Sequence, residues 1–67
     1  MRNNLKRQRL VVGQLTQQDM AERAGVTRQT IIAIEKGSFN PSVKLALKLA
    51  KILNTTVEEL FILESKD

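Results

Sequence analysis

The sequence predicts an all-α fold of five short helices in one compact domain, and three observations support this prediction. Apolar residues recur at helical spacing over nearly the whole 67-residue chain. Turn-forming residues interrupt this pattern at 13–14, 25, 37–41 and 54–55, which divides the chain into five segments. Threonine stands before three of these segments, where its hydroxyl accepts a hydrogen bond from an unpaired first-turn amide.

The first helix is predicted over residues 4–12, with Leu5, Arg9 and Val12 on its inward stripe. Glu35 lies on the inward stripe of a later helix. An uncompensated buried charge is costly, so each of these two charged residues needs a partner. We therefore expect a structural ion pair between Arg9 and Glu35. The alternative is that both side chains extend to solvent and never meet.

The second and third helices form a unit over residues 16–36. The second helix follows Thr16, with Asp19 three residues later, and the third helix follows Thr27. Gly25 lies between them where the chain must reverse, because glycine adopts a left-handed backbone at little cost. Two short capped helices joined by a glycine turn are typical of a helix-turn-helix. The small and branched residues that allow these helices to pack are Ala21, Val26, Ile31 and Ile34.

The fourth helix follows Pro41 and Ser42, and its wide apolar surface indicates a central position in the domain, a subunit interface, or both. Its predicted inward stripe is Val43, Ala46, Leu47, Ala50 and Leu53. The fifth helix starts after Thr56, forms a capping box with Glu59 and runs to about residue 61. We predict that residues 52–63 contain the dimer interface. Its expected contacts are Ile52, Leu60, Phe61, Ile62 and Leu63.

Composition narrows the functional classes. The net charge is +4, with +7 in residues 1–54 and −3 in residues 55–67, so the main body suits a polyanionic partner. Cysteine and histidine are absent, which argues against disulfides, zinc sites and an enzyme. We expect no metal, cofactor, small-molecule ligand or membrane partner, and a cytoplasmic location. A chain this short gains stability from a second subunit, so we expect a homodimer.

The outward face of the third helix is the candidate DNA-reading surface. With Ile31 inward, Arg28, Gln29, Ile32 and Ala33 are the expected base contacts. Gln29 suits an adenine edge, Arg28 a guanine or a phosphate, and the two apolar residues a thymine methyl. The alternative is that Arg28 and Gln29 are ordinary solvent-facing residues and that Ile32 belongs to the core or to a partner interface.

A second set of polar residues is expected to contact DNA phosphates, which fix register without specifying sequence. For any one of them, simple solvation is the alternative. These residues are Gln17, Thr27, Lys36, Ser38 and Asn40.

Several segments together resemble the phage-repressor-like Cro/cI (XRE) helix-turn-helix family, and are similar to its minimal stand-alone regulators. The resemblance implies a lambda-repressor-like DNA-binding domain, with the helix after Thr27 in the major groove. It also implies the pair between Arg9 and Glu35, and it offers a short strand at 61–64 paired with residues 1–3. The segments that carry the resemblance are 15–21, 25–31, 34–37, 40–42 and 58–61.

The expected function is a sequence-specific double-stranded DNA-binding transcriptional regulator, most often a repressor in this family. It would bind a palindromic or pseudo-palindromic operator as a homodimer, with recognition helices about 34 Å apart. The alternative is an antitoxin or another protein-binding module with autoregulatory DNA binding. Only residues 63–67 follow the predicted fold, which disfavours a segment that wraps a toxin.

Overall fold

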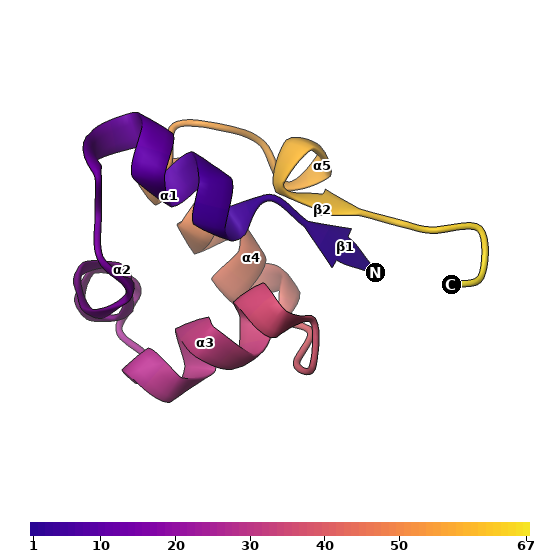
Figure 1. Ribbon diagram of the computed structural model, residues 1–67, viewed down its shortest axis with the longest axis horizontal. Helices are drawn as coiled ribbons and strands as arrows, with labels where there is room; N and C mark the ends of the chain where they lie inside the picture. The colour runs from indigo at the N-terminus through magenta and orange to yellow at the C-terminus, as the bar shows by residue number, and fades with distance from the viewer.

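A computed structural model describes all 67 residues and contains five helices and one pair of short strands (Figure 1). The helices pack around one core, and the two strands lie side by side at the end of the molecule that holds both chain termini. None of the helices has the length and apolar character needed to cross a membrane. In chain order the elements are β1 (Arg2–Asn3), α1 (Leu5–Gly13), α2 (Gln17–Ala24), α3 (Arg28–Lys36), α4 (Val43–Ile52), α5 (Val57–Leu60) and β2 (Phe61–Ile62).

Side-chain caps start four of the helices. The Thr16 hydroxyl accepts a hydrogen bond from the Asp19 amide, and the Asp19 carboxylate accepts one from the Thr16 amide, both at 3.0 Å. The bond from the Thr16 amide holds the pKa of the Asp19 carboxyl below its ordinary value. The hydroxyls of Thr27, Ser42 and Thr56 cap α3, α4 and α5 by accepting a hydrogen bond from the amide three residues later.

The predicted capping box of α5 is only half formed. Thr56 accepts from the Glu59 amide at 3.2 Å, but the Glu59 carboxylate accepts from the Thr55 hydroxyl at 2.8 Å and does not reach the backbone of the cap. The helix also ends at Leu60, one residue earlier than expected, because Phe61 is extended and begins β2.

The two strands confirm the terminal pairing that the family resemblance implied. They are antiparallel, with Arg2 opposite Ile62 and Asn3 opposite Phe61. The Asn3 side chain donates a 2.8 Å hydrogen bond to the Ile34 carbonyl near the end of α3. The start of the chain is therefore attached to the end of the third helix.

The core follows the predicted stripes in α2 and α3 but differs in α1 and α4. Leu5 and Arg9 are buried, whereas Val12 is exposed. In α4, Val43 and Leu47 are 77% and 57% exposed. The inward stripe keeps the predicted Ala46, Ala50 and Leu53 and adds Leu49 in place of Val43 and Leu47, at the spacings of three, four and seven residues that a packed helix uses. That stripe is Ala46, Leu49, Ala50 and Leu53.

Candidate nucleic-acid interface

The chain reverses between α2 and α3 at Gly25, whose φ of +74° is readily accessible to glycine. Figure 1 views α2 along its axis, whereas α3 runs across the view, so the two helices cross at a steep angle. Ala21 and Ala24 of α2 and Ile31 and Ile34 of α3 are buried in the shared core. Crossed helices packed around a glycine turn leave the opposite face of α3 open.

The open face of α3 carries the predicted base-contact residues. Arg28 and Gln29 are exposed, and Ile32 and Ala33 are half-buried. Ile32 does not join the core cluster that Ile31 belongs to. The structure therefore places these residues on one accessible face, with a mixture of amide, cationic and aliphatic groups.

The predicted phosphate-contact residues differ in how free their side chains are. Lys36 and Asn40 are exposed, and neither side chain makes a hydrogen bond or ion pair within the protein. The Ser38 hydroxyl donates to the Ala33 carbonyl at 3.2 Å and so caps the end of α3. Thr27 is exposed, and as the N-cap of α3 its hydroxyl accepts a hydrogen bond from the Thr30 amide at 3.2 Å.

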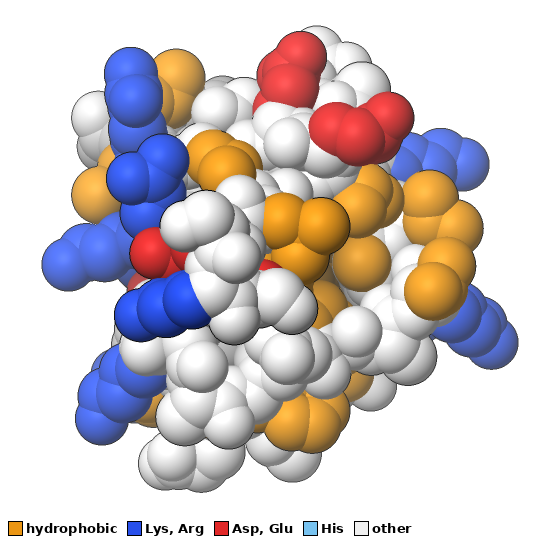
Figure 2. Space-filling view, turned by 90° about the vertical axis from the view of Figure 1, so that its right-hand side faces the viewer, with side chains coloured by type: hydrophobic (Ala, Val, Ile, Leu, Met, Phe, Trp, Pro, Cys, Tyr) orange, Lys and Arg blue, Asp and Glu red, His pale blue; other side chains and the backbone are white.

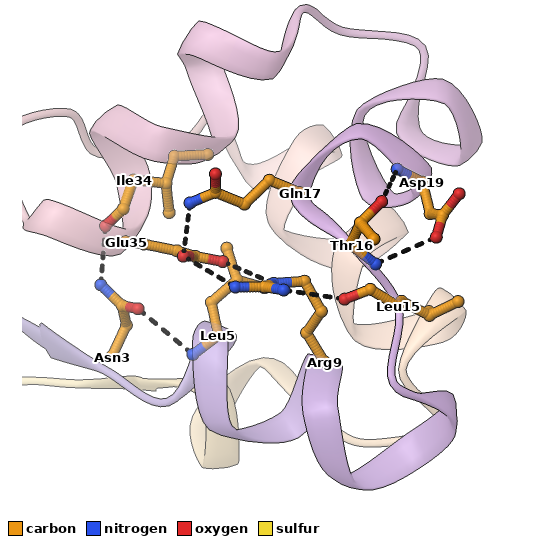
Figure 3. Close-up of polar contacts among 9 residues, drawn as sticks. All are labelled: Asn3, Leu5, Arg9, Leu15, Thr16, Gln17, Asp19, Ile34 and Glu35. Carbon is orange, nitrogen blue, oxygen red and sulfur yellow. Dashed lines mark hydrogen bonds and ion pairs between the residues drawn. The ribbon is translucent and has the colours of Figure 1, made fainter.

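Arg9 and Glu35 form the expected ion pair (Figure 3). The Arg9 Nε donates to Glu35 Oε2 at 2.9 Å and the Arg9 Nη2 to Glu35 Oε1 at 3.3 Å. A third bond runs from Arg9 Nη1 to the Leu15 carbonyl at 2.8 Å. The two side chains are only 8% and 7% exposed, so the pair belongs to the interior.

Gln17, the first residue of α2, also binds this pair. Its Nε2 donates to Glu35 Oε1 at 3.1 Å, as Figure 3 shows. The Glu35 carboxylate, which belongs to α3, therefore accepts hydrogen bonds from side chains of both α1 and α2. Sequence reasoning expected Gln17 only as a phosphate contact, because its link to Glu35 depends on how α2 and α3 cross.

A polar hollow opens beside this network. It contains no hydrophobic residue, and it is lined from three helices and the α1–α2 connection. Lys6 and Gln18 line the hollow but were not predicted from the sequence. The one sequence signal was that Lys6 stands three residues before Arg9, which is a helical spacing. We call this hollow the cationic notch, and its lining residues are Lys6, Arg9, Thr16, Gln17, Gln18 and Arg28.

An apolar patch lies elsewhere on the surface, over α4, α5 and the start of β2. Figure 2 shows hydrophobic side chains gathered on this side of the molecule, with acidic side chains above them. Its lining residues, which we call the α4–α5 patch, are Met1, Pro41, Val43, Ala46, Leu47, Val57 and Phe61.

The expected dimer contacts require one correction. Leu60 is 1% exposed, because the short α5 packs against α4, and it belongs to the same core cluster as Leu49 and Leu53. It is therefore a structural residue and not a surface contact. Of the other expected contacts, Ile52, Phe61 and Ile62 are half-buried and Leu63 is exposed.

Together, the crossed helices, the glycine turn and the open polar face define a helix-turn-helix DNA-binding domain. A family model described as Helix-turn-helix matches residues 5–60. The chain belongs to this family, in its XRE (Cro/cI-like) form, and is a DNA-binding HTH-type transcriptional regulator.

Relatives and solved structures agree with this membership. The chain is 51% identical over 67 residues to an HTH-type transcriptional regulator of Methanocaldococcus jannaschii and 43% identical over 67 residues to YgzD of Bacillus subtilis, covering 100% of each chain in both cases. It resembles the restriction-modification controller protein C.AhdI from Aeromonas hydrophila, with a TM-score of 0.75, 35% identity and 85% of each chain covered. It also resembles a chain of the SinR/SinI protein complex, with a TM-score of 0.77, 28% identity, and 92% and 65% coverage.

Proposed function

We propose that this protein represses transcription by binding a palindromic or pseudo-palindromic operator as a homodimer, with α3 in the major groove. The observation that carries the proposal is the open face of α3, where Gln29, Ile32 and Ala33 stand together beside the exposed Lys36. A repressor bound over a promoter would compete with RNA polymerase for the same DNA.

Three residues of α3 would read bases. The Gln29 amide carries the paired donor and acceptor that match the major-groove edge of adenine, and the aliphatic side chains of Ile32 and Ala33 suit a thymine methyl. Gln29 is exposed and has no hydrogen-bond partner in the protein, so its amide is available. This mixture of groups predicts a preference for adenine and thymine under the middle of α3.

Phosphates on either side of the groove would fix the register. Lys36 and Asn40 are free to contact one strand from the end of α3 and the loop after it. Gln17 offers its second amide hydrogen, since the first is bound by Glu35. We expect less from Thr27 and Ser38, because their hydroxyls already cap the two ends of α3.

The α4–α5 patch supports a homodimer. Val43 and Leu47 expose aliphatic side chains on α4 beside the half-buried Val57 and Phe61. A contiguous apolar patch on the surface of a small protein is typical of an interaction site. A two-fold contact here would join identical surfaces, and operator binding by such a dimer requires the two α3 helices to lie in successive major grooves about 34 Å apart. Leu63, which is 77% exposed, would extend the contact.

The base and phosphate roles separate experimentally. Gln29→Ala should weaken binding to the selected operator by about 1–3 kcal/mol and relax the preference at one base pair. Lys36→Ala should weaken binding to all duplexes alike and reduce the salt dependence by about one unit. Lys51→Ala, which removes an exposed lysine of α4 outside the reading face, serves as the control. Equal effects of Gln29→Ala on operator and random DNA would contradict its role as a base reader.

The dimer is tested by sedimentation with two exposed leucines. Leu47→Lys should give monomers, since it places a charge in the α4–α5 patch. Leu10→Lys changes a leucine on α1 that is 48% exposed, against 57% for Leu47, and should leave the dimer intact. A Leu47→Lys variant that remains dimeric would place the interface elsewhere. A wild-type monomer would favour the alternative, in which the patch binds a different protein and the chain acts as an antitoxin or protein-binding module.

A further inference from the structure

The cationic notch is a meeting point of positive charge from two different helices. Lys6 comes from α1 and Arg28 from the first turn of α3, and the polar side chains of Gln17 and Gln18 lie between them. No acidic residue lines the notch. No acidic residue precedes Asp19 in the chain either.

The three cations of the notch are not equivalent. Arg9 is neutralised by Glu35 at 2.9 Å, so this buried pair contributes little net charge to the surface above it. Lys6 and Arg28 have no ion-pair partner and no internal hydrogen bond, and both are exposed. The net positive charge of the notch is therefore theirs.

Two unpaired cations facing one polar hollow suit an oxyanion. An Arg guanidinium and a Lys ammonium both form charge-assisted hydrogen bonds to phosphate oxygens, and together they offset its charge better than either alone. Lys6 stands on α1 and Arg28 on α3, and both line this one hollow, so the two cations can act on the same anion. Arg28 lines this hollow, whereas the other expected base contacts, Gln29, Ile32 and Ala33, do not.

We propose that Lys6 and Arg28 bind one DNA phosphate between them in the cationic notch, so that Arg28 fixes the register of α3 and does not read guanine. This inference rests on the proposed operator binding and assigns α1 a place in the DNA interface. Gln17, whose amide donates to Glu35, lines the same notch.

The test compares three charge-removing variants, Lys6→Gln, Arg28→Gln and Arg7→Gln, in the full chain. Arg7 is the control, because it is an exposed cation next to Lys6 that lines a different hollow with Asn4, Gln8 and Val11. All three sites are exposed, so thermal melting should match the wild type and exclude unfolding as a cause. Binding to a selected operator and to a random duplex is measured between 50 and 200 mM salt.

Loss of one phosphate contact lowers the magnitude of the slope of log affinity against log salt by about 0.9. Between 50 and 200 mM salt, the affinity of such a variant should therefore fall by a factor about 3.5-fold smaller than that of the wild type. We expect this change for Lys6→Gln and for Arg28→Gln, on both duplexes, with unchanged base preference. Arg7→Gln should retain the wild-type slope.

Two results would overturn the inference while leaving the proposed function intact. The first is a Lys6→Gln slope equal to that of Arg7→Gln, with Gln29→Ala still impairing operator binding. The second is a change in base preference at one position in Arg28→Gln, which would make Arg28 a base reader. A wild-type chain that binds no DNA would reject the proposed function and this inference together.

Discussion

Replacing Glu35 with alanine tests the buried ion pair that joins the first three helices. The substitution removes the partner of Arg9 and the acceptor for Gln17 in one step. Arg9 keeps only its bond to the Leu15 carbonyl. With side chains 8% and 7% exposed, the pair is almost fully desolvated, so solvent does little to relieve the charge that remains.

The expected loss of stability is large for so small a domain. Removing one partner of a buried ion pair costs about 3–5 kcal/mol. In a domain of this size each kcal/mol corresponds to roughly 4–8 °C in melting temperature, so Glu35→Ala should melt roughly 12–40 °C below the wild type. Glu35→Gln should lose less, since its amide oxygen still accepts hydrogen bonds from Arg9.

Thermal unfolding followed by circular dichroism measures these differences. The double variant Arg9→Met/Glu35→Leu supplies the decisive comparison, because it removes both charges and fills the space with aliphatic atoms. It should melt above Glu35→Ala, since no unpaired charge remains. A Glu35→Ala melting temperature within about 4 °C of the wild type, or additive effects in the double variant, would refute the reasoning.

Three further predictions concern folding. Leu60→Lys should abolish cooperative melting, because the charge would enter the core. Phe61→Lys, in contrast, should fold and give monomers. A folded Leu60→Lys chain would contradict the burial of Leu60. Gly25→Ala should lower the free energy of unfolding by about 1 kcal/mol, because the φ of residue 25 is +74°, whereas Gly13→Ala in α1 should be neutral or stabilising. Equal melting temperatures for these two variants would contradict the turn geometry. The pKa of Asp19 is lower in the folded chain than in the unfolded chain, where it is about 3.9. The stabilisation of the fold by the Asp19 carboxylate is therefore complete above that unfolded pKa and is lost as the pH falls through the folded pKa. The difference in melting temperature between the wild type and Asp19→Asn should therefore shrink in acid, and a constant difference would exclude this carboxylate as the cause.

Local chemistry explains which parts of the fold were predictable. Thr16, Thr27 and Thr56 cap the helices that follow them, since a cap depends on neighbours within three residues. The pair between Arg9 and Glu35 followed from helical stripes alone, because two inward charges require each other. The exposed face of α3 followed from the same projection.

What the sequence did not predict depends on packing between distant elements. α4 is aliphatic on most of its surface, so periodicity did not decide between Leu47 and Leu49 for the core. Leu60 lies among apolar neighbours in sequence, and only its contact with α4 shows that it is buried. The cationic notch joins Lys6 to Arg28 through three-dimensional placement, which no local pattern encodes.

The central claim is sequence-specific binding of DNA by a symmetric dimer, and selection from a random duplex library followed by sequencing tests it most directly. The account predicts enrichment of a short inverted repeat with half-sites one helical turn apart, and loss of that enrichment in Gln29→Ala. Salt-sensitive binding without any enriched sequence, or an enriched single half-site, would contradict it.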